Sequence, residues 1–482
     1  MPVDPRETNT IYDDKYDEWT CNIDFAEMPL KTLRDGEYLD EFGGKAAEAA
    51  SQYNLRKQMS MTWDLAADLI DMRVQELWRT LPARDYAESK YKREIEAFLA
   101  DVDGGGTAID GFMRDITRLV HINGVDVLVD REQTITDPVS RADEKAQAIV
   151  TAYTPIERLD WDTDHAGNFN WVRFDAGAVG TVDEDDTGGE QRYITYTKDA
   201  WRVYLVSAEK GVETEVVEGT HNMGVVPVVP VYWGKSIQYP NQAVAASLMS
   251  RLSPISRYML NLTSQGQLDL YLSVCFLVAS GVPADQLPTA IGASTMLSIQ
   301  DPAGDLKPVF GSTDHIKEKA AWLDMATLAQ LRIGKVLGLA ASLEGRAQSG
   351  VQVAMEASPL HSELSATAKN LEASETEIVR LAVSRVTGDL IDRDDLGYSV
   401  KYNDRFTLQS ATDLIKQATG LANIPNASEL SDLIRIYLRK ILDHGARSGS
   451  DEYEAAREQL ENFTADNVNT DLSLDVDEDE TV

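Results

Sequence analysis

The chain has 482 residues, and its 80 acidic and 45 basic side chains give a formal net charge of −35. Such a surface repels phosphate and anionic lipid, so the composition excludes ordinary groove binding to nucleic acid. Two explanations of the charge stay open. One is a very acidic partner-binding protein, and the other is a protein adapted to concentrated salt, where the Debye length is only ~3 Å at 1 M. The acids are spread along the whole chain, which favours salt adaptation.

Residues 1–55 are polar and acidic and predict arms and short helices. Apolar residues then recur at helical spacing from Gln58 to Leu81, before Pro82. Two more helices are expected, over 86–106 with three glycines at the end and over 109–122. "NGVDVLVD" follows and predicts a buried strand after a glycine turn.

From Ile149 to Trp233 the apolar residues alternate with polar ones, which predicts strands separated by turns. The strand candidates are "AYTPIERLDWD", "NFNWVRFDA", "QRYITYTK", "AWRVYLVS" and "VETEVVEG". "VVPVVPVYW" closes the region, and its prolines confine it to an edge or an extended segment. Residues 1–235 are therefore interpreted as one α+β domain.

Helical periodicity returns from Asn241 to residue 272, with Pro254 predicting a kink or a break. Residues 273–313 predict short strands and turns. A helix over 314–338 follows, with Asp314 as a plausible N-cap.

After the glycine-flanked segment "GLAASLEGRAQSGVQ", a long helix is expected to run to about Val386. Leu364, Leu371 and Ile378 form one narrow apolar stripe along it. "LIDRDDLGYSVKYNDRF" predicts a strand or hairpin. Residues 408–462 predict a smaller helical unit, and the acidic tail after Phe463 has the composition of a disordered segment.

The sequence carries no motif that supports catalysis. "WGKS" at Trp233–Ser236 lacks the upstream glycine of a phosphate loop, and "GGGTAIDG" joins two helices instead of following a strand. No two of the six histidines stand three or four apart, and "DTDHAGN" lacks the closing glutamate of a calcium loop. We therefore expect no enzyme, no catalytic or metal-ligating residues and no cofactor.

Membrane and disulfide signals are also missing. Cys21 and Cys275 are too few for a disulfide framework or a structural zinc site. "MPVDPRETNT" has no features of a signal peptide. The most apolar run, "LDLYLSVCFLVASGV", is shorter than the ~20 residues of a membrane helix and contains Asp269. We expect a soluble protein that is made inside the cell and does not enter a membrane.

The serial order of these parts resembles the portal protein of tailed double-stranded DNA viruses, over residues 58–462. Three stretches are locally similar to the family: "NGVDVLVD" with "AYTPIERLDW", "PVVPVYWG" before the first stem helix, and "SVCFLVASG" as the first clip strand. The resemblance implies an α+β fold with a wing, a two-helix stem, a small β-rich clip, a long tunnel helix and an α-helical crown. It assigns 1–57 to an N-terminal arm, 58–240 to the wing, 241–272 to stem helix 1, 273–313 to the clip, 314–338 to stem helix 2, 339–350 to the tunnel loop, 351–406 to the tunnel helix and a wing strand, 407–462 to the crown and 463–482 to an acidic disordered tail.

Such a protein would form a ring of about twelve subunits at one capsid vertex. Viral double-stranded DNA would pass through it without sequence specificity during packaging and ejection. The expected partners are the large terminase, which supplies the force, the head–tail adaptor and the major capsid protein. The protein would be found in the virion, and in the host cytoplasm during assembly. The acidic composition would fit a virus of a halophilic archaeon.

The resemblance also suggests residues that face the channel. Arg346 of the tunnel loop would contact phosphate, with Gln348 and Ser349 as hydrogen-bonding groups. The alternative is that Arg346 only pairs with Glu344 in a connector. On the stem helices, the candidates for inter-subunit, solvent or DNA contact are Arg251, Arg257, Lys317, Lys319, Arg332 and Lys335.

Two other classes of function stay open. An acidic scaffold or adaptor would be a monomer or dimer, with the helices over 241–272 and 314–338 folded into one compact domain. A hydrolase-like enzyme would show a pocket with converging titratable groups.

Overall fold

The computed structural model describes eleven stretches of the chain. They are residues 4–27, 37–41, 50–61, 65–131, 147–179, 190–207, 213–272, 276–280, 305–309, 314–335 and 350–403. The chain mixes helices and sheets and divides into two compact units. The first unit contains Met1–Thr20, Asp68–Leu248 and Gly334–Val482, and the second contains Cys21–Ala67 and Met249–Ile333.

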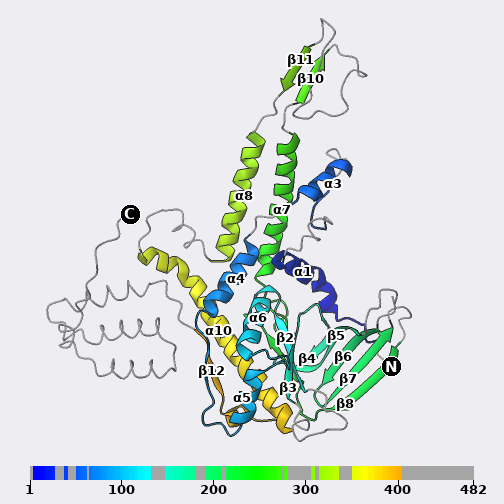
Figure 1. Cartoon of the computed structure of the whole chain (residues 1–482), viewed down its shortest axis with the longest axis vertical. Coiled ribbons are helices and arrows are strands. Elements are labelled where there is room, and N and C mark those ends of the chain that lie inside the picture. The colour runs from blue at the N-terminus through cyan, green and yellow to red at the C-terminus, as the bar shows by residue number, and fades with distance from the viewer. Residues whose placement is uncertain are drawn as a thin grey trace, which may run out of the picture. The chain divides into compact units, whose positions relative to one another are not determined.

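The first unit contains a five-stranded antiparallel sheet in which each strand pairs with the next along the chain (Figure 1). Its strands are β4 (Arg158–Thr163), β5 (Phe169–Val179), β6 (Glu190–Thr197), β7 (Ala200–Ser207) and β8 (Glu213–Thr220). The alternation predicted these strands correctly. One change concerns "AYTPIERLDWD", which is two strands instead of one. A turn at Pro155 divides it, because Glu157 Oε2 accepts the Thr154 amide at 2.6 Å and the Glu157 amide donates to Thr154 O at 3.0 Å.

A second sheet of three antiparallel strands has the order β3-β2-β9. The strands are β2 (Val125–Arg131), β3 (Ala148–Tyr153) and β9 (Val228–Val231). The central strand β2 is buried from residue 125 to 129, which explains its nearly continuous apolar sequence. Pro230, which has no amide hydrogen, lies in the edge strand β9 as predicted.

The apolar core of the first unit lies between these sheets and the start of α1 (Thr10–Glu27). Phe174 stacks on Tyr153 at a centroid distance of 4.3 Å, and both rings are buried. Tyr12 and Trp19 of α1 belong to the same cluster. The segment expected to be an arm therefore contributes a helix of 18 residues that packs into the core.

The helices of the first unit match the sequence predictions in part. They are α5 (Lys92–Ala100), α6 (Ile109–Ile122), α10 (Gly350–Thr387) and α11 (Arg393–Leu396), together with most of α4 (Ala66–Leu77). The prediction for α6 is confirmed. The single helix expected from Gln58 to Leu81 is wrong: α3 (Ala50–Met59) ends before Met61, and α4 ends before Leu81. Met61 and Leu81 are exposed, so the apolar stripe is shorter than its periodicity suggested.

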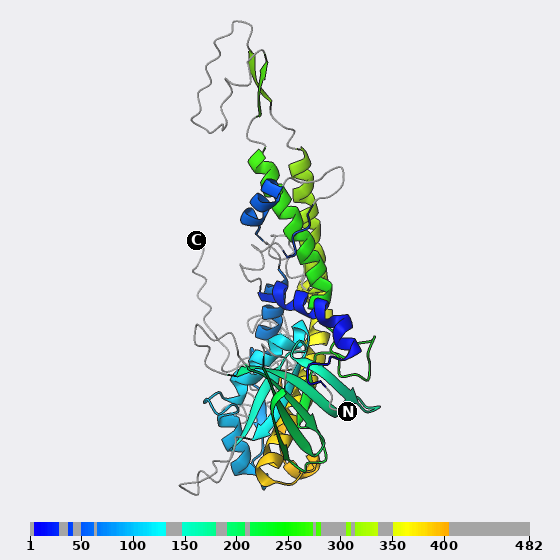
Figure 2. The same cartoon turned by 90° about the vertical axis from the view of Figure 1, so that its right-hand side faces the viewer.

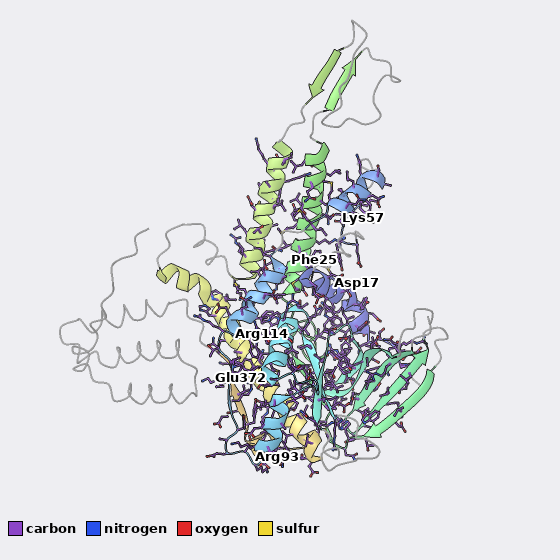
Figure 3. The ribbon with its side chains drawn as sticks, in the orientation of Figure 1. Asp17, Phe25, Lys57, Arg93, Arg114 and Glu372 are labelled. Carbon is purple, nitrogen blue, oxygen red and sulfur yellow. The ribbon has the colours of Figure 1, made fainter. Side chains whose placement is uncertain are left out.

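The long helix α10 is confirmed and runs through Pro359 for 38 residues. Its predicted stripe is buried: Leu364, Leu371 and Ile378 have at most 1% of their surface exposed. The helix packs against β2, β3, β9 and α5. It also packs against a small sheet of β1 (Ala83–Asp85) and β12 (Ser399–Lys401), where Glu372, labelled in Figure 3, accepts the Tyr402 amide at 2.9 Å.

The second unit contains α3, α7 (Met249–Leu272) and α8 (Asp314–Ile333). Helices α7 and α8 run side by side in opposite directions (Figures 1 and 2). Between them in the chain, β10 (Phe276–Ser280) and β11 (Asp305–Val309) form an antiparallel pair, which confirms strands in this region. We refer to α7, α8 and this strand pair as the helical hairpin.

The helices of the hairpin begin and end at other residues than the sequence predicted. Helix α7 begins at Met249 and not at Asn241, because the amides before it are already engaged: Ala246 donates to Gly234 O and Leu248 to His121 O. Pro254 lies inside α7, so the alternative of a break there is wrong. Helix α8 ends at Ile333, short of residue 338, and Lys335 follows in the left-handed conformation with φ +59°. Asp314 is the first residue of α8 and does not precede it as a cap.

Candidate interface on the helical hairpin

Helix α8 presents apolar side chains on its outer side. Trp322, Met325 and Leu328 are exposed by 52%, 57% and 48%. Their spacing of three places them on one flank of the helix. Ala326 and Gln330 of the same helix are buried. We call Trp322, Met325 and Leu328 the α8 flank.

The inside of the same unit contains several buried polar side chains. The buried Gln330 donates to Ser256 Oγ of α7 at 3.1 Å, and its Oε1 accepts the Leu65 amide at 3.0 Å. At the start of α7, Ser253 Oγ donates to Asn22 Oδ1 at 2.8 Å. Buried polar groups of this kind need their partners, and they gain less from burial than apolar side chains do. Large apolar side chains therefore face outward on α8 while part of the packed inner surface is polar.

A buried arginine adds to this polar interior. Arg56 of α3 has no exposed surface, and it donates to Asp40 O at 2.6 Å and to Ser264 Oγ of α7 at 3.5 Å. Thr263 Oγ1 of α7 donates to Met61 O at 2.9 Å. These contacts hold the hairpin against α3 through directional bonds.

The predicted stem cations have different environments. Lys319 forms an ion pair with Asp269 of α7, and Arg257 pairs with Asp40 at 2.7 Å. Lys335 belongs to the first unit, where it pairs with Glu363; that carboxylate also binds the buried Arg73 at 3.0 Å. These three charges are thus compensated within the chain.

Three further stem cations are exposed: Arg251 on α7, and Lys317 and Arg332 on α8. Within the described part of the chain, Arg251 and Arg332 form no ion pair. They are the stem cations most available to a partner or to a polyanion. Their position does not decide between these two, so the predicted contact stays a prediction.

The tunnel-loop candidates Glu344, Arg346, Gln348 and Ser349 lie outside the described residues, as do the predicted crown over 407–462 and the acidic tail. Helix α10 begins at Gly350, directly after these four residues. The predicted contacts of these four side chains with DNA therefore remain untested.

Other sequence motifs have local structural roles. In "DTDHAGN", Asp164 accepts the amides of Ala166 and Asn168 at 2.8 and 2.9 Å, so its carboxylate closes a tight turn. In the loop between α5 and α6, Asp101 accepts the amides of Gly104 and Gly106 at 2.8 and 3.0 Å. No group of three or more potential metal ligands occurs among the residues that the structure describes.

The sequence interpretation missed the α8 flank. A signal was present in "AWLDMATLAQL", where apolar residues occur on more than one side of the helix. A helix that is apolar on two opposite sides is expected to be covered on both. None of the described helices has the length and apolar character to cross a lipid bilayer.

Comparisons with known proteins give only distant similarities. No protein-family model matches the sequence, and no curated protein matches it. The solved structures that are similar to the chain include two with 10% sequence identity each. In the neck of an empty GTA particle computed with C6 symmetry, the match covers 80% of this chain and 94% of the other, with a TM-score of 0.39. In the virion of a native gene transfer agent particle, it covers 80% and 93%, with a TM-score of 0.35.

Proposed function

We propose that this chain is the subunit of a portal-type ring, a structural conduit at one vertex of a virion. The observation that carries the proposal is the α8 flank. It is an apolar strip on the outside of a two-helix hairpin whose inside is partly polar. Neighbouring hairpins in a closed ring would cover it, because a repeated heterologous contact places the same outer face against the next subunit.

The energy available from this contact is sufficient when it is repeated. Complete burial of a large apolar side chain gains about 1.5–3 kcal/mol. Since Trp322, Met325 and Leu328 are each about half exposed, covering one of them would add on the order of 1 kcal/mol. A ring repeats this contribution at every interface. An exposed aromatic beside an apolar pair is also the composition expected for an interface centre.

The test compares assembly of the full-length protein and its variants in concentrated NaCl, by mass photometry and electron microscopy. Wild type should form rings with a central hole. Met325→Glu, which places a charge on the α8 flank, should shift the population to monomers. Leu390→Glu is the matched control, because Leu390 has 41% exposure and belongs to the first unit, whereas the hairpin belongs to the second. A monomer or dimer of wild type under all salt conditions would refute the ring and favour an acidic adaptor.

The finer parts of the proposal concern DNA and partners. DNA would pass through the ring with Glu344, Arg346, Gln348 and Ser349 at the bore, and Arg251 and Arg332 would supply inter-subunit or DNA contacts. The subunit itself would have no enzymatic activity, and the large terminase would provide the force. The head–tail adaptor and the major capsid protein would bind the ring, and high salt would suit its acidic surface.

Packaging assays test the proposed DNA contact. Arg346→Ala should lower the amount of DNA packaged while leaving the rings intact. Unchanged packaging would remove the loop from the channel. A loss of rings would show instead that the loop serves assembly.

A further inference from the structure

A cavity of about 720 Å³ lies in the first unit, and all its lining residues belong to that unit. On β3, β6 and β7 alternate residues line it, in keeping with the two-residue period of a strand, and the end of β2 contributes the consecutive residues Asp130 and Arg131. On β2 and β3, Asp130 is opposite Ile149. On β6 and β7, Tyr196 is opposite Trp201. The end of α10 contributes Arg385 to the same lining.

The charge of the lining is opposite to that of the protein. Arg131, Arg192 and Arg385 line the cavity, whereas Asp130 is the one carboxylate among the described lining residues. The C-terminal end of α10 opposes an anion with about half a unit of negative charge. The balance still leaves an excess of positive charge, in a chain whose formal net charge is −35.

Asp130 is already satisfied by its neighbours. Its carboxylate accepts the Tyr196 hydroxyl at 2.5 Å and the Arg131 amide at 2.8 Å, and it forms an ion pair with Arg385. Asp130 therefore holds Arg385 in place, and it does not compensate the other two arginines. No ion pair of Arg131 or Arg192 occurs in the part of the chain that the structure describes.

Two guanidinium groups have donors without acceptors. The Nε atoms of Arg131 and Arg385 are buried and have no hydrogen-bond partner. The Arg385 side chain is only 9% exposed. A buried donor without an acceptor is costly, so folded proteins rarely keep one unless something else binds it. An anion in this cavity would supply the missing acceptors.

We propose that the cavity binds a small organic anion, with a phosphate or carboxylate group held by Arg131 and Arg385. Arginine is suited to both groups because its planar donors match their paired oxygens. The apolar part of the ligand would lie against Trp201 and Ile194, which line the cavity from β7 and β6. This proposal does not depend on ring formation.

The test is isothermal titration calorimetry on the full-length protein, with phenyl phosphate as the probe at constant ionic strength. Wild type should bind it. Arg131→Gln should weaken the affinity on the order of 10- to 100-fold, the usual effect of one charge-assisted hydrogen bond. Arg202→Gln is the matched control. Arg202 alternates with the lining residues Trp201 and Val203 on β7, its side chain is 51% exposed, and it pairs with Glu218 at 2.6 Å.

Two further probes identify the part of the ligand that is recognised. Benzoate that binds as well as phenyl phosphate would point to a carboxylate ligand, and benzoate that does not bind would point to a phosphate. Inorganic phosphate should bind more weakly than phenyl phosphate if the apolar wall contributes. The proposal is overturned if none of the three anions binds, or if Arg131→Gln binds phenyl phosphate as tightly as wild type and the Arg202→Gln control.

Discussion

The buried Glu375 tests how much the contacts of helix α10 with β1 and the residues around β12 contribute to stability. It lies on α10 with none of its surface exposed, and its carboxylate accepts hydrogen bonds from three side chains. Arg84 of β1 donates through Nε at 2.7 Å and Nη2 at 3.3 Å. The hydroxyls of Tyr398 and Tyr402 donate at 2.6 and 2.5 Å. The perturbation is Glu375→Gln, which keeps the size of the side chain and removes its charge.

The expected loss of stability follows from the hydrogen bonds that the glutamine amide cannot accept. Glutamine has one oxygen acceptor, and its NH₂ group would face donors. Burial, together with the nearby Glu375, keeps the pKa of Tyr402 well above its usual range, so the phenol remains a donor. Arg84 would keep only Asp110, at 2.7 Å, as a charged partner. Breaking one side of a buried pair costs about 3–5 kcal/mol, and Tyr402→Phe, which removes one bond, should cost about 1.5–3 kcal/mol.

The assay is urea unfolding at fixed NaCl, followed by tryptophan fluorescence. The fluorescence of Trp78 reports on this region, because its ring packs edge to face on that of Tyr402 with a centroid distance of 5.5 Å. Glu377→Gln is the matched control: the same change on the same helix, at a carboxylate that is 26% exposed and pairs with Arg380. The reasoning is refuted if Glu375→Gln destabilises the protein no more than Glu377→Gln does.

Two further predictions concern the first unit. Burial lowers the pKa of His121 from 6.5 to about 4. Between these values the unfolded chain binds a proton that the folded chain does not. The contribution of His121 to the free energy of unfolding should therefore be fully present above pH 6.5, and the free energy of unfolding should fall by about 3 kcal/mol toward pH 4. His121→Gln should flatten that part of the pH profile in urea titrations, and an unchanged slope would contradict the assignment. Gly124→Ala should cost about 2–4 kcal/mol by thermal unfolding, because Gly124 has φ +81° and an added Cβ would lie 2.5 Å from Ala245 Cβ. Gly106→Ala is its control, with φ +91° but no atom within 4 Å, and an equal loss in both would exclude the steric contribution.

The sequence determined the elements whose signals are local. Period-two alternation located the strands of the five-stranded sheet, and the stripe of Leu364, Leu371 and Ile378 located the buried side of α10. Pro227 and Pro230 predicted an edge or an extended segment, because proline has no amide hydrogen to donate to a neighbouring strand. These properties depend on residues within a few positions of each other, so one sequence is enough to show them.

Helix boundaries depended on the rest of the fold. Nothing in the composition from Asn241 to Leu248 opposes a helix, yet Ala246 and Leu248 donate their amides to Gly234 and His121. An amide that is bonded elsewhere cannot donate to a helical carbonyl, so α7 begins only at Met249. Helix propensity is a weak preference, and such tertiary hydrogen bonds override it.

The candidate sites depended on tertiary structure even more strongly. Residues 83–85 pair with 399–401, which brings Arg84 to Glu375 across almost the whole described chain. The cavity arginines come from two strands, β2 and β6, and from the helix α10, and the exposure of Met325 depends on which side of α8 meets α7. A sequence pattern shows that a side chain is apolar or charged. Only the packing of distant segments decides whether that side chain is covered, paired or left free for a partner, because burial is a property of neighbours that the local sequence does not contain.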